Sequence, residues 1–119
     1  MKPIMLAAVL LVVGCGGASD AVEAQTAANA TAEATAAIAA AETAAPKDHP
    51  QASLHLKLAR DQLQQAKRLM QEDETEKAGL LLQRATADAE LALMLARETD
   101  AKEKAARARA QVEALPENQ

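Results

Sequence analysis

The stretch ASLHLKLARDQLQQAKRLM, residues 52–70, decides the fold. Its apolar side chains recur at alternating spacings of four and three residues, which is the heptad repeat of helices that pack along a narrow seam. We therefore predict a helix over residues 51–72 that packs against another helix along this seam. The seam consists of Ala52, Leu56, Ala59, Leu63, Ala66 and Met70.

A second seam with the same alternation follows a polar turn. Asp73 and Glu76 in this turn have the spacing of a capping box, which predicts the start of a helix over residues 75–115 that ends before Pro116. Gly79 is expected to admit the backbone of the partner helix. Because small residues of this seam can face the leucines of the first, we expect an antiparallel hairpin. The seam consists of Ala78, Leu82, Ala85, Ala89, Ala92 and Ala96, and the alternation is kept by Ala101, Ala105, Ala108, Val112 and Leu115.

The segment before the hairpin, residues 20–45, is rich in alanine and has Val22 and Ile38 as its larger apolar side chains. Alanine favours helix. The segment offers little apolar area, however, so it is predicted to be either a helix stabilised by packing or a disordered stalk. Residues 46–50 contain two prolines and break the helical pattern. Asp48 is expected to cap the start of the next helix.

Composition and length set the architecture. The chain has no aromatic residue, and alanine and leucine, both strong helix formers, supply most of its apolar content, so the fold class is all-α. The helices over residues 51–72 and 75–115 would be about 35 Å and about 60 Å long, so the second overhangs the first. We predict an elongated antiparallel, coiled-coil-like helical hairpin with an Ala-rich N-terminal helix along the overhang. The alternative is a three-helix bundle, and residues 116–119 are a tail.

The N-terminal residues resemble a bacterial lipoprotein signal peptide. Lys2 precedes an apolar run over residues 4–13, which is about half of the roughly 20 residues that span a bilayer. Small residues then lead to Cys15, the single cysteine of the chain. The residues before it, Val12, Val13 and Gly14, resemble a lipobox.

This resemblance implies that residues 1–14 are removed and that Cys15 receives a diacylglycerol and a further acyl group. Three acyl chains would hold the protein at a membrane almost permanently. Residues 15–19 would then be a lipidated cysteine followed by a flexible tether. Because Gly16 and not Asp follows the cysteine, the enterobacterial sorting rule favours the outer membrane, facing the periplasm, over the inner membrane. The competing interpretation is a lone buried thiol in a helix.

Charge and motifs limit the chemistry. The net charge of −4 is spread without a basic block, so we expect no nucleic-acid binding. His49 and His55 are six residues apart without a nearby cysteine, so we expect capping or surface histidines and no metal site. The chain has no phosphate-binding loop and no nucleophile motif, so we expect no cofactor and no enzymatic activity. Asp88 is expected to be a partly exposed, solvated side chain, and the alternatives are a polar residue that fixes helix register and a binding residue.

A pattern of alanine, leucine and acidic residues extends over about residues 40–112, and the run DAELA at residues 88–92 is its most specific part. The matching positions are Ala45, Pro46, Leu54, Leu58, Ala59, Leu63, Ala66, Asp73, Ala78, Leu81, Ala85, Asp88, Ala89, Glu90, Leu91 and Ala92. This pattern resembles the bacterial domain-of-unknown-function family 4398. The resemblance implies a helical envelope lipoprotein and supplies no catalytic residues.

The sequence favours a structural or adaptor protein of the bacterial envelope that acts through helix-helix contacts. A hairpin alone buries its leucines only in part, so we expect a protein partner or a homo-oligomer. The alternative is a small helical binding module for a peptide or an apolar ligand in the periplasm. The expected interaction face consists of Leu56, Leu63, Met70, Leu82, Asp88 and Leu91.

Overall fold

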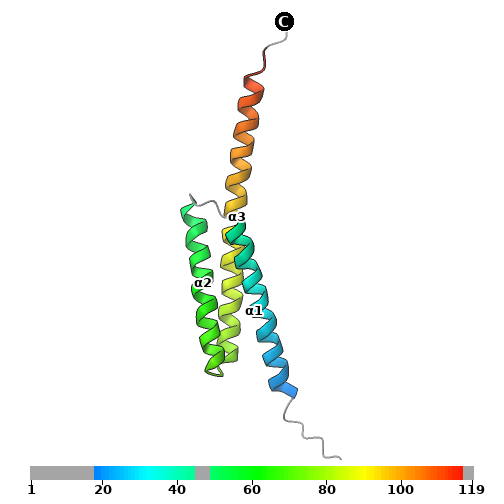
Figure 1. Cartoon of the computed structure of the whole chain (residues 1–119), viewed down its shortest axis with the longest axis vertical. Helices are drawn as coiled ribbons and strands as arrows, with labels where there is room; N and C mark the ends of the chain where they lie inside the picture. The colour runs from blue at the N-terminus through cyan, green and yellow to red at the C-terminus, as the bar shows by residue number, and fades with distance from the viewer. Residues whose placement is uncertain (1–17, 45–48, 117–119) are drawn as a thin grey trace, which may run out of the picture.

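A computed structural model describes residues 18–44 and 49–116, with side chains from residue 21 onward. These residues form three helices and no strand: α1 (Ala18–Ala44), α2 (Pro50–Gln71) and α3 (Thr75–Glu113). The all-α prediction is confirmed (Figure 1). The predicted helices agree with these bounds within a few residues, but Ala18 and Ser19, expected in the tether, belong to α1.

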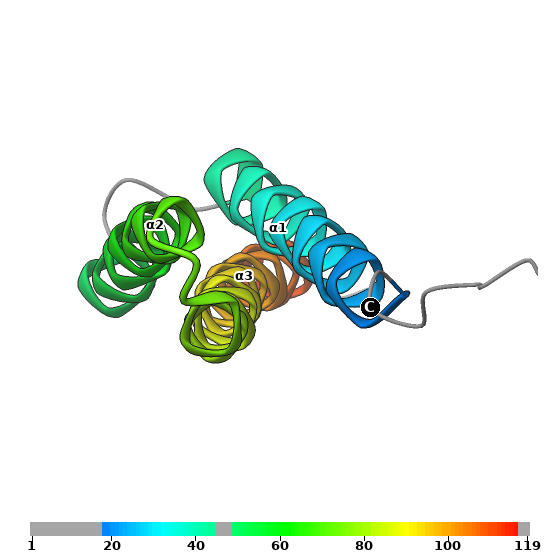
Figure 2. The same ribbon diagram turned by 90° about the horizontal axis from the view of Figure 1, so that it is seen from below.

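The long helix α3 is the centre of the fold, and α1 and α2 both pack against it. α1 and α3 run in the same direction and α2 runs in the opposite direction (Figure 1). Seen along the helices, α1 and α2 lie next to each other on the same side of α3 (Figure 2). The antiparallel α2–α3 hairpin is therefore present. The expectation that the Ala-rich helix lies along the overhang is wrong, because α1 packs beside the hairpin in the three-helix arrangement given as the alternative.

Both predicted seams form the core. In α2, every seam residue is buried except Met70, which is partly buried against the core. In α3, all six seam residues from Ala78 to Ala96 are buried, and Leu82 is the largest side chain that is fully enclosed. Alternating spacings of four and three residues keep one stripe of a helix facing its partner, which explains why the sequence predicts these positions so well.

α1 supplies a third seam that the sequence analysis did not identify. Ala27, Ala34, Ile38 and Ala41 are buried, with 0% exposure at Ala34 and Ala41. Their spacings of seven, four and three residues place them on one face. Since alanine has the smallest apolar side chain, this seam lets α1 approach the hairpin closely and contribute a helix without large apolar groups.

Both ends of the α2 region differ from the predicted caps. His49 caps α2, because its Nδ1 accepts a hydrogen bond from the backbone N–H of Ala52 at 3.1 Å. The residue expected to cap it, Asp48, lies outside the described residues. Pro50 occupies the first turn, where its missing N–H costs nothing.

The α2–α3 turn uses Asp73 as a helix end and not as a helix start. Asp73 has a φ of 59°, and the N–H of Glu74 donates to the carbonyl of Leu69 at 2.9 Å. This is the bonding pattern of a Schellman motif that closes α2. The cap residue of α3 is Glu74, without a side-chain capping bond, so the predicted Asp73–Glu76 capping box is wrong.

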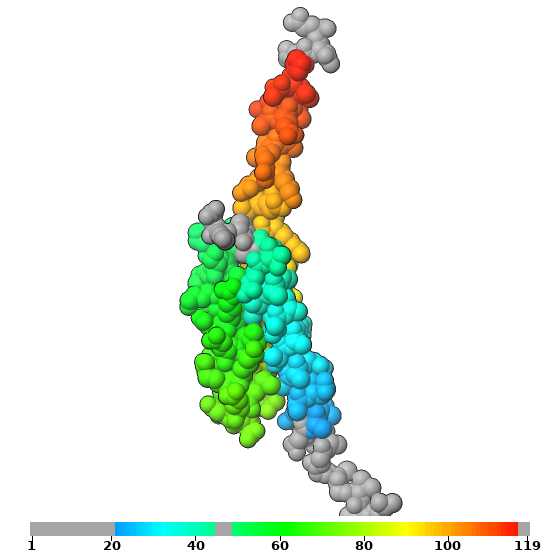
Figure 3. Space-filling view, viewed as in Figure 1, coloured from blue at the N-terminus to red at the C-terminus, as the bar shows by residue number. Residues whose placement is uncertain are grey.

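Beyond the bundle, α3 continues as a single helix. We call residues 100–113 the arm, and every residue in it is exposed. The space-filling view shows the arm projecting past the ends of α1 and α2 (Figure 3). Of the described helices, none combines the length and the apolar character needed to cross a membrane.

Candidate interaction surface

The predicted interaction face does not exist as one surface. Leu56, Leu63 and Leu82 are at most 9% exposed and belong to the core between the helices. Met70 lies at the core edge, where its sulfur is 3.7 Å from the hydroxyl oxygen of Thr31. These residues hold the bundle together and are not available to a partner. Leu91 and Asp88, the other two members, lie nearer the surface.

Asp88 joins α3 to α2 through two hydrogen bonds. One carboxylate oxygen lies 2.8 Å from Nδ1 of His55, and the other accepts from Nε2 of Gln62 at 2.8 Å. The side chains of His55 and Asp88 are 27% and 21% exposed. Asp88 is therefore partly exposed as expected, but it is not simply solvated: its two bonds to α2 make it a polar residue that ties two helices in register, which was one of the alternatives. Because His55 and Gln62 are seven residues apart and share a helix face, their spacing was a usable signal for this contact.

The exposed apolar residues of α3 lie on the face opposite the core. They are offset by two residues from the buried seam, which turns them by about 200° around the helix axis. Met94 is 65% exposed, Leu80 59% and Leu91 40%. We call this row the outer stripe of α3. It consists of Leu80, Ala87, Leu91, Met94, Ala101, Ala105, Ala108 and Val112, with Arg84 and Glu98 as its charged members.

The outer stripe corrects one prediction about the arm. The alternating spacing in the sequence predicts that Ala101 and the apolar positions after it continue the core seam. The step from Ala96 to Ala101 is five residues, however, which rotates the row by about 140°. The arm therefore continues the outer stripe, and its apolar residues have no partner among the described residues, as the 68% exposure of Val112 shows.

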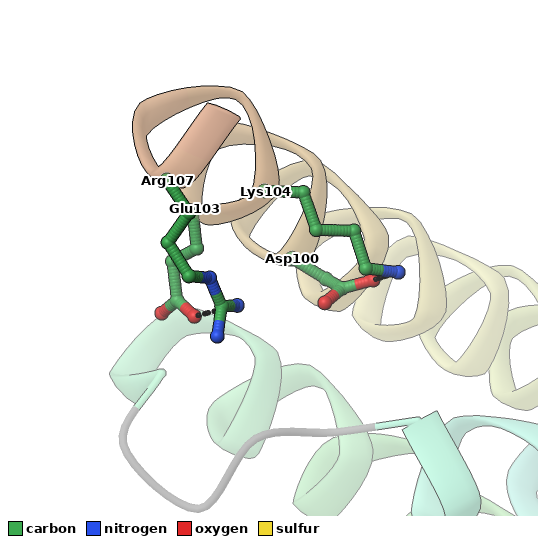
Figure 4. A network of polar contacts seen from close by, with 4 residues as sticks. All are labelled: Asp100, Glu103, Lys104 and Arg107. Atoms are coloured by element: carbon green, nitrogen blue, oxygen red, sulfur yellow. Dashed lines mark hydrogen bonds and ion pairs between the residues drawn. The ribbon is translucent and has the colours of Figure 1, made fainter. Parts of the chain in front are cut away.

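Ion pairs along the arm stabilise it as a free helix. Nζ of Lys104 lies 2.6 Å from the Asp100 carboxylate, and the Arg107 guanidinium lies 3.5 Å from that of Glu103 (Figure 4). In each pair the acid precedes the base by four residues, which is the favourable order in a helix. Just before the arm, the hydrogen bond and charge of Lys102 lower the pKa of Glu98.

An open groove with a volume of about 620 Å³ lies between the start of α1 and the start of α3. Val22 and Ala30 line it from α1, and Gly79 and Gln83 line it from α3. A Cβ atom added at Gly79 would meet nothing within 4 Å. The expectation that Gly79 admits a partner backbone is therefore wrong, and the position faces open space.

Within residues 18–44 and 49–116, no three His, Cys, Asp or Glu side chains are grouped so as to hold a metal ion. His49 acts as a helix cap and His55 contacts Asp88. Cys15, the predicted lipidation site, lies outside the described residues.

The fold and its surface define an all-α helical protein whose central helix presents an uncovered apolar face. The chain belongs to the family described as Domain of unknown function (DUF4398), whose model matches residues 29–115. No curated protein and no solved structure matches the chain significantly. The family match supports the resemblance drawn from the sequence, and it extends over α2, α3 and most of α1.

Proposed function

We propose that this protein is a non-enzymatic, lipid-anchored component of the bacterial cell envelope that acts as a structural or adaptor element through helix-helix contacts. The outer membrane, facing the periplasm, is its proposed location. The observation that carries the adaptor role is the outer stripe of α3, in which apolar side chains with heptad spacing remain exposed on a helix whose other face is already packed.

The lipobox-like sequence before Cys15 supports the anchor. α1 begins at Ala18, shortly after this cysteine. Lipidation of Cys15 would therefore hold the three helices next to the membrane surface, where they could meet other envelope proteins. Three acyl chains would make this attachment nearly permanent.

The anchor is tested by metabolic labelling with a radioactive fatty acid. The wild-type chain should incorporate label, and the Cys15→Ser variant should not. The control is a Ser53→Ala variant, which carries a substitution away from Cys15 and should incorporate as much label as the wild type. Equal labelling of the wild type and the Cys15→Ser variant would refute the anchor.

The adaptor role is tested by chemical crosslinking of the full-length protein in membranes. A discrete oligomer, with itself or with another protein, is expected. A protein that stays monomeric in membranes and retains a bound small molecule would refute the adaptor role.

The groove between α1 and α3 favours a second candidate function, the binding of a peptide or an apolar ligand. Native mass spectrometry of the purified full chain would then detect a retained small molecule. A Gly79→Leu substitution, which extends a side chain into the groove, should remove it, and the smaller Gly79→Ala substitution should reduce it less. If the wild-type chain carries no ligand, this candidate fails.

A further inference from the structure

The outer stripe of α3 spans both the bundled part of the helix and the arm. Its members alternate at spacings of four and three residues from Leu80 to Val112, and they are apolar except for Arg84 and Glu98. α1 and α2 both pack on the opposite face of α3, and the large apolar side chains of the stripe stay 40–68% exposed, so neither helix covers it. A heptad stripe of this length on a free helix face fits a second helix of similar length.

The charges beside the stripe divide sharply along α3. In a heptad helix, the positions that flank the apolar stripe face the flanking positions of the partner helix and set its orientation. In the bundled half, the charged flanking residues are acidic: Glu76, Asp88 and Glu90. In the second half, they are basic: Arg97, Lys102, Lys104 and Arg109.

The separation of acidic and basic residues along α3 determines how the α3 helices of two copies can pair. Parallel pairing of two copies would bring Arg97 against Lys102 and Lys104 against Arg109, so like charges would repel. Antiparallel pairing brings the acidic half of one α3 against the basic half of the other. Glu90 also forms no ion pair within the described part of the chain, which leaves its carboxylate available.

We propose that two copies of this chain associate antiparallel through the outer stripes of their α3 helices. The pairing that uses the whole stripe from Leu80 to Val112 sets Leu80 opposite Val112 and Leu91 opposite Ala101, so that each leucine faces a smaller side chain. The same register sets Met94 opposite Glu98. Glu90 then lies beside Lys104 of the second copy. The overlap is about 50 Å long.

Charges near the centre of the overlap also come together in this pairing. Lys102 of one copy approaches Asp88 of the other. The two Arg97 side chains meet near the twofold axis, where Glu98 of each copy lies next to them and offsets their repulsion. Within its own helix, Nζ of Lys104 lies 2.6 Å from the Asp100 carboxylate. In the dimer, Lys104 would leave this partner and pair with Glu90 of the second copy.

A second copy of the chain would be the partner in the proposed helix-helix role, and the biological meaning of the dimer rests on that proposed function. It also has a geometric consequence. Because α1 and α3 start at the same end of the bundle (Figure 1), an antiparallel dimer places the starts of its two α1 helices at opposite ends. Two lipid anchors would therefore hold the dimer from both ends.

Orientation is tested with cysteine pairs in the full chain carrying Cys15→Ser. One preparation carries Glu90→Cys and the other Lys104→Cys, and each is treated with a short bis-maleimide crosslinker, alone and mixed. The mixture should give a covalent dimer, and each variant alone should give little. A dimer from each single variant would show parallel pairing and overturn the proposal.

Association itself is tested by analytical ultracentrifugation of the same Cys15→Ser chain. A Met94→Glu substitution on the stripe should raise the dimer dissociation constant at least tenfold. The matched control is Leu54→Glu, since Leu54 is 54% exposed on α2 and lies off the stripe, and it should leave dimerisation unchanged. A wild-type chain that remains monomeric would overturn the proposal. This holds even if the stripe binds a different protein.

The pairing of Glu90 with Lys104 of the second copy is also tested by ultracentrifugation. Lys104→Glu should weaken the dimer severalfold, and adding Glu90→Lys in the same chain should restore it, because the swapped charges again oppose each other. If the double variant is as weak as the single one, the antiparallel charge match is refuted. Fatty-acid labelling is independent of these results, so the anchor can stand when the dimer fails.

Discussion

Asp73 carries a backbone conformation that its side chain disfavours. Its φ of 59° lies in the left-handed region, where a Cβ atom crowds the following carbonyl and glycine is the preferred residue. We predict that Asp73→Gly raises the free energy of unfolding by about 0.5–1 kcal/mol, measured by urea denaturation. The control is Glu72→Gly, at a position with a φ of −96°, which should gain nothing. A less stable Asp73→Gly variant would contradict this account of the turn.

Asp88 is the polar contact that fixes α2 against α3. We predict that Asp88→Ala lowers the free energy of unfolding by about 1–2 kcal/mol, because His55 and Gln62 each lose an acceptor at a partly buried site. The matched control is Asp61→Ala, which removes an exposed pair with Lys57 and should change stability by less than about 0.5 kcal/mol. Equal effects of the two substitutions in thermal melts would show that the Asp88 contact contributes nothing specific.

At the level of residues, the sequence predicted buried positions better than polar contacts. The heptad seams identified residues such as Ala59 and Leu82 because periodicity alone fixes which side of a helix is buried. The contact between His55 and Asp88 depends on how two helices are rotated and aligned, which no local pattern specifies. The role of Asp73 was missed because its spacing to Glu76 imitates a helix start.

Gly79 weakens α3 without a packing reason, since nothing lies within 4 Å of the place where its Cβ would be. We predict that Gly79→Ala stabilises the fold by about 1 kcal/mol through helix propensity, measured by chemical denaturation. The nearby exposed substitution Gln83→Ala should have a much smaller effect. No gain at Gly79 would contradict the conclusion that the glycine has no packing role in α3.

α1 depends on the small size of its seam residues. Ala34 is completely buried in the core cluster, so Ala34→Leu should push α1 outward and lower the free energy of unfolding by about 1–3 kcal/mol. Ala36→Leu, two residues away on the exposed side, should be nearly neutral. The stability of both variants is measured by circular dichroism during thermal unfolding. An Ala34→Leu variant as stable as the wild type would contradict the close packing of α1.

The placement of α1 could not be predicted from helix lengths. Matching lengths suggested that it lies along the overhang, but only a short connection separates Ala44 from Pro50, and short connections place consecutive helices side by side and antiparallel. Folding back also lets the seam around Ile38 bury itself against the hairpin. The short connection was a usable signal in the sequence, but an alanine seam gives only a weak hydrophobic signal to support it.

The whole molecule is a thin bundle with a projecting arm, and its form follows from composition. Without aromatic residues, the core consists of alanine with a few larger aliphatic side chains, so the helices pack closely and enclose little volume. α3 has two apolar faces, and α1 and α2 together cover only one of them. The uncovered face is therefore the part of the molecule that a function in helix-helix contact would use.

Site-specific photo-crosslinking in intact cells tests this claim most directly. A photoreactive amino acid is placed in the full-length chain at Met94, on the outer stripe, or at Leu54, which is comparably exposed but lies on α2. We predict a crosslinked product of one defined mass from position 94 and none from position 54. No product from position 94, or equal products from both positions, would contradict the claim that the outer face of α3 is the contact surface of this protein.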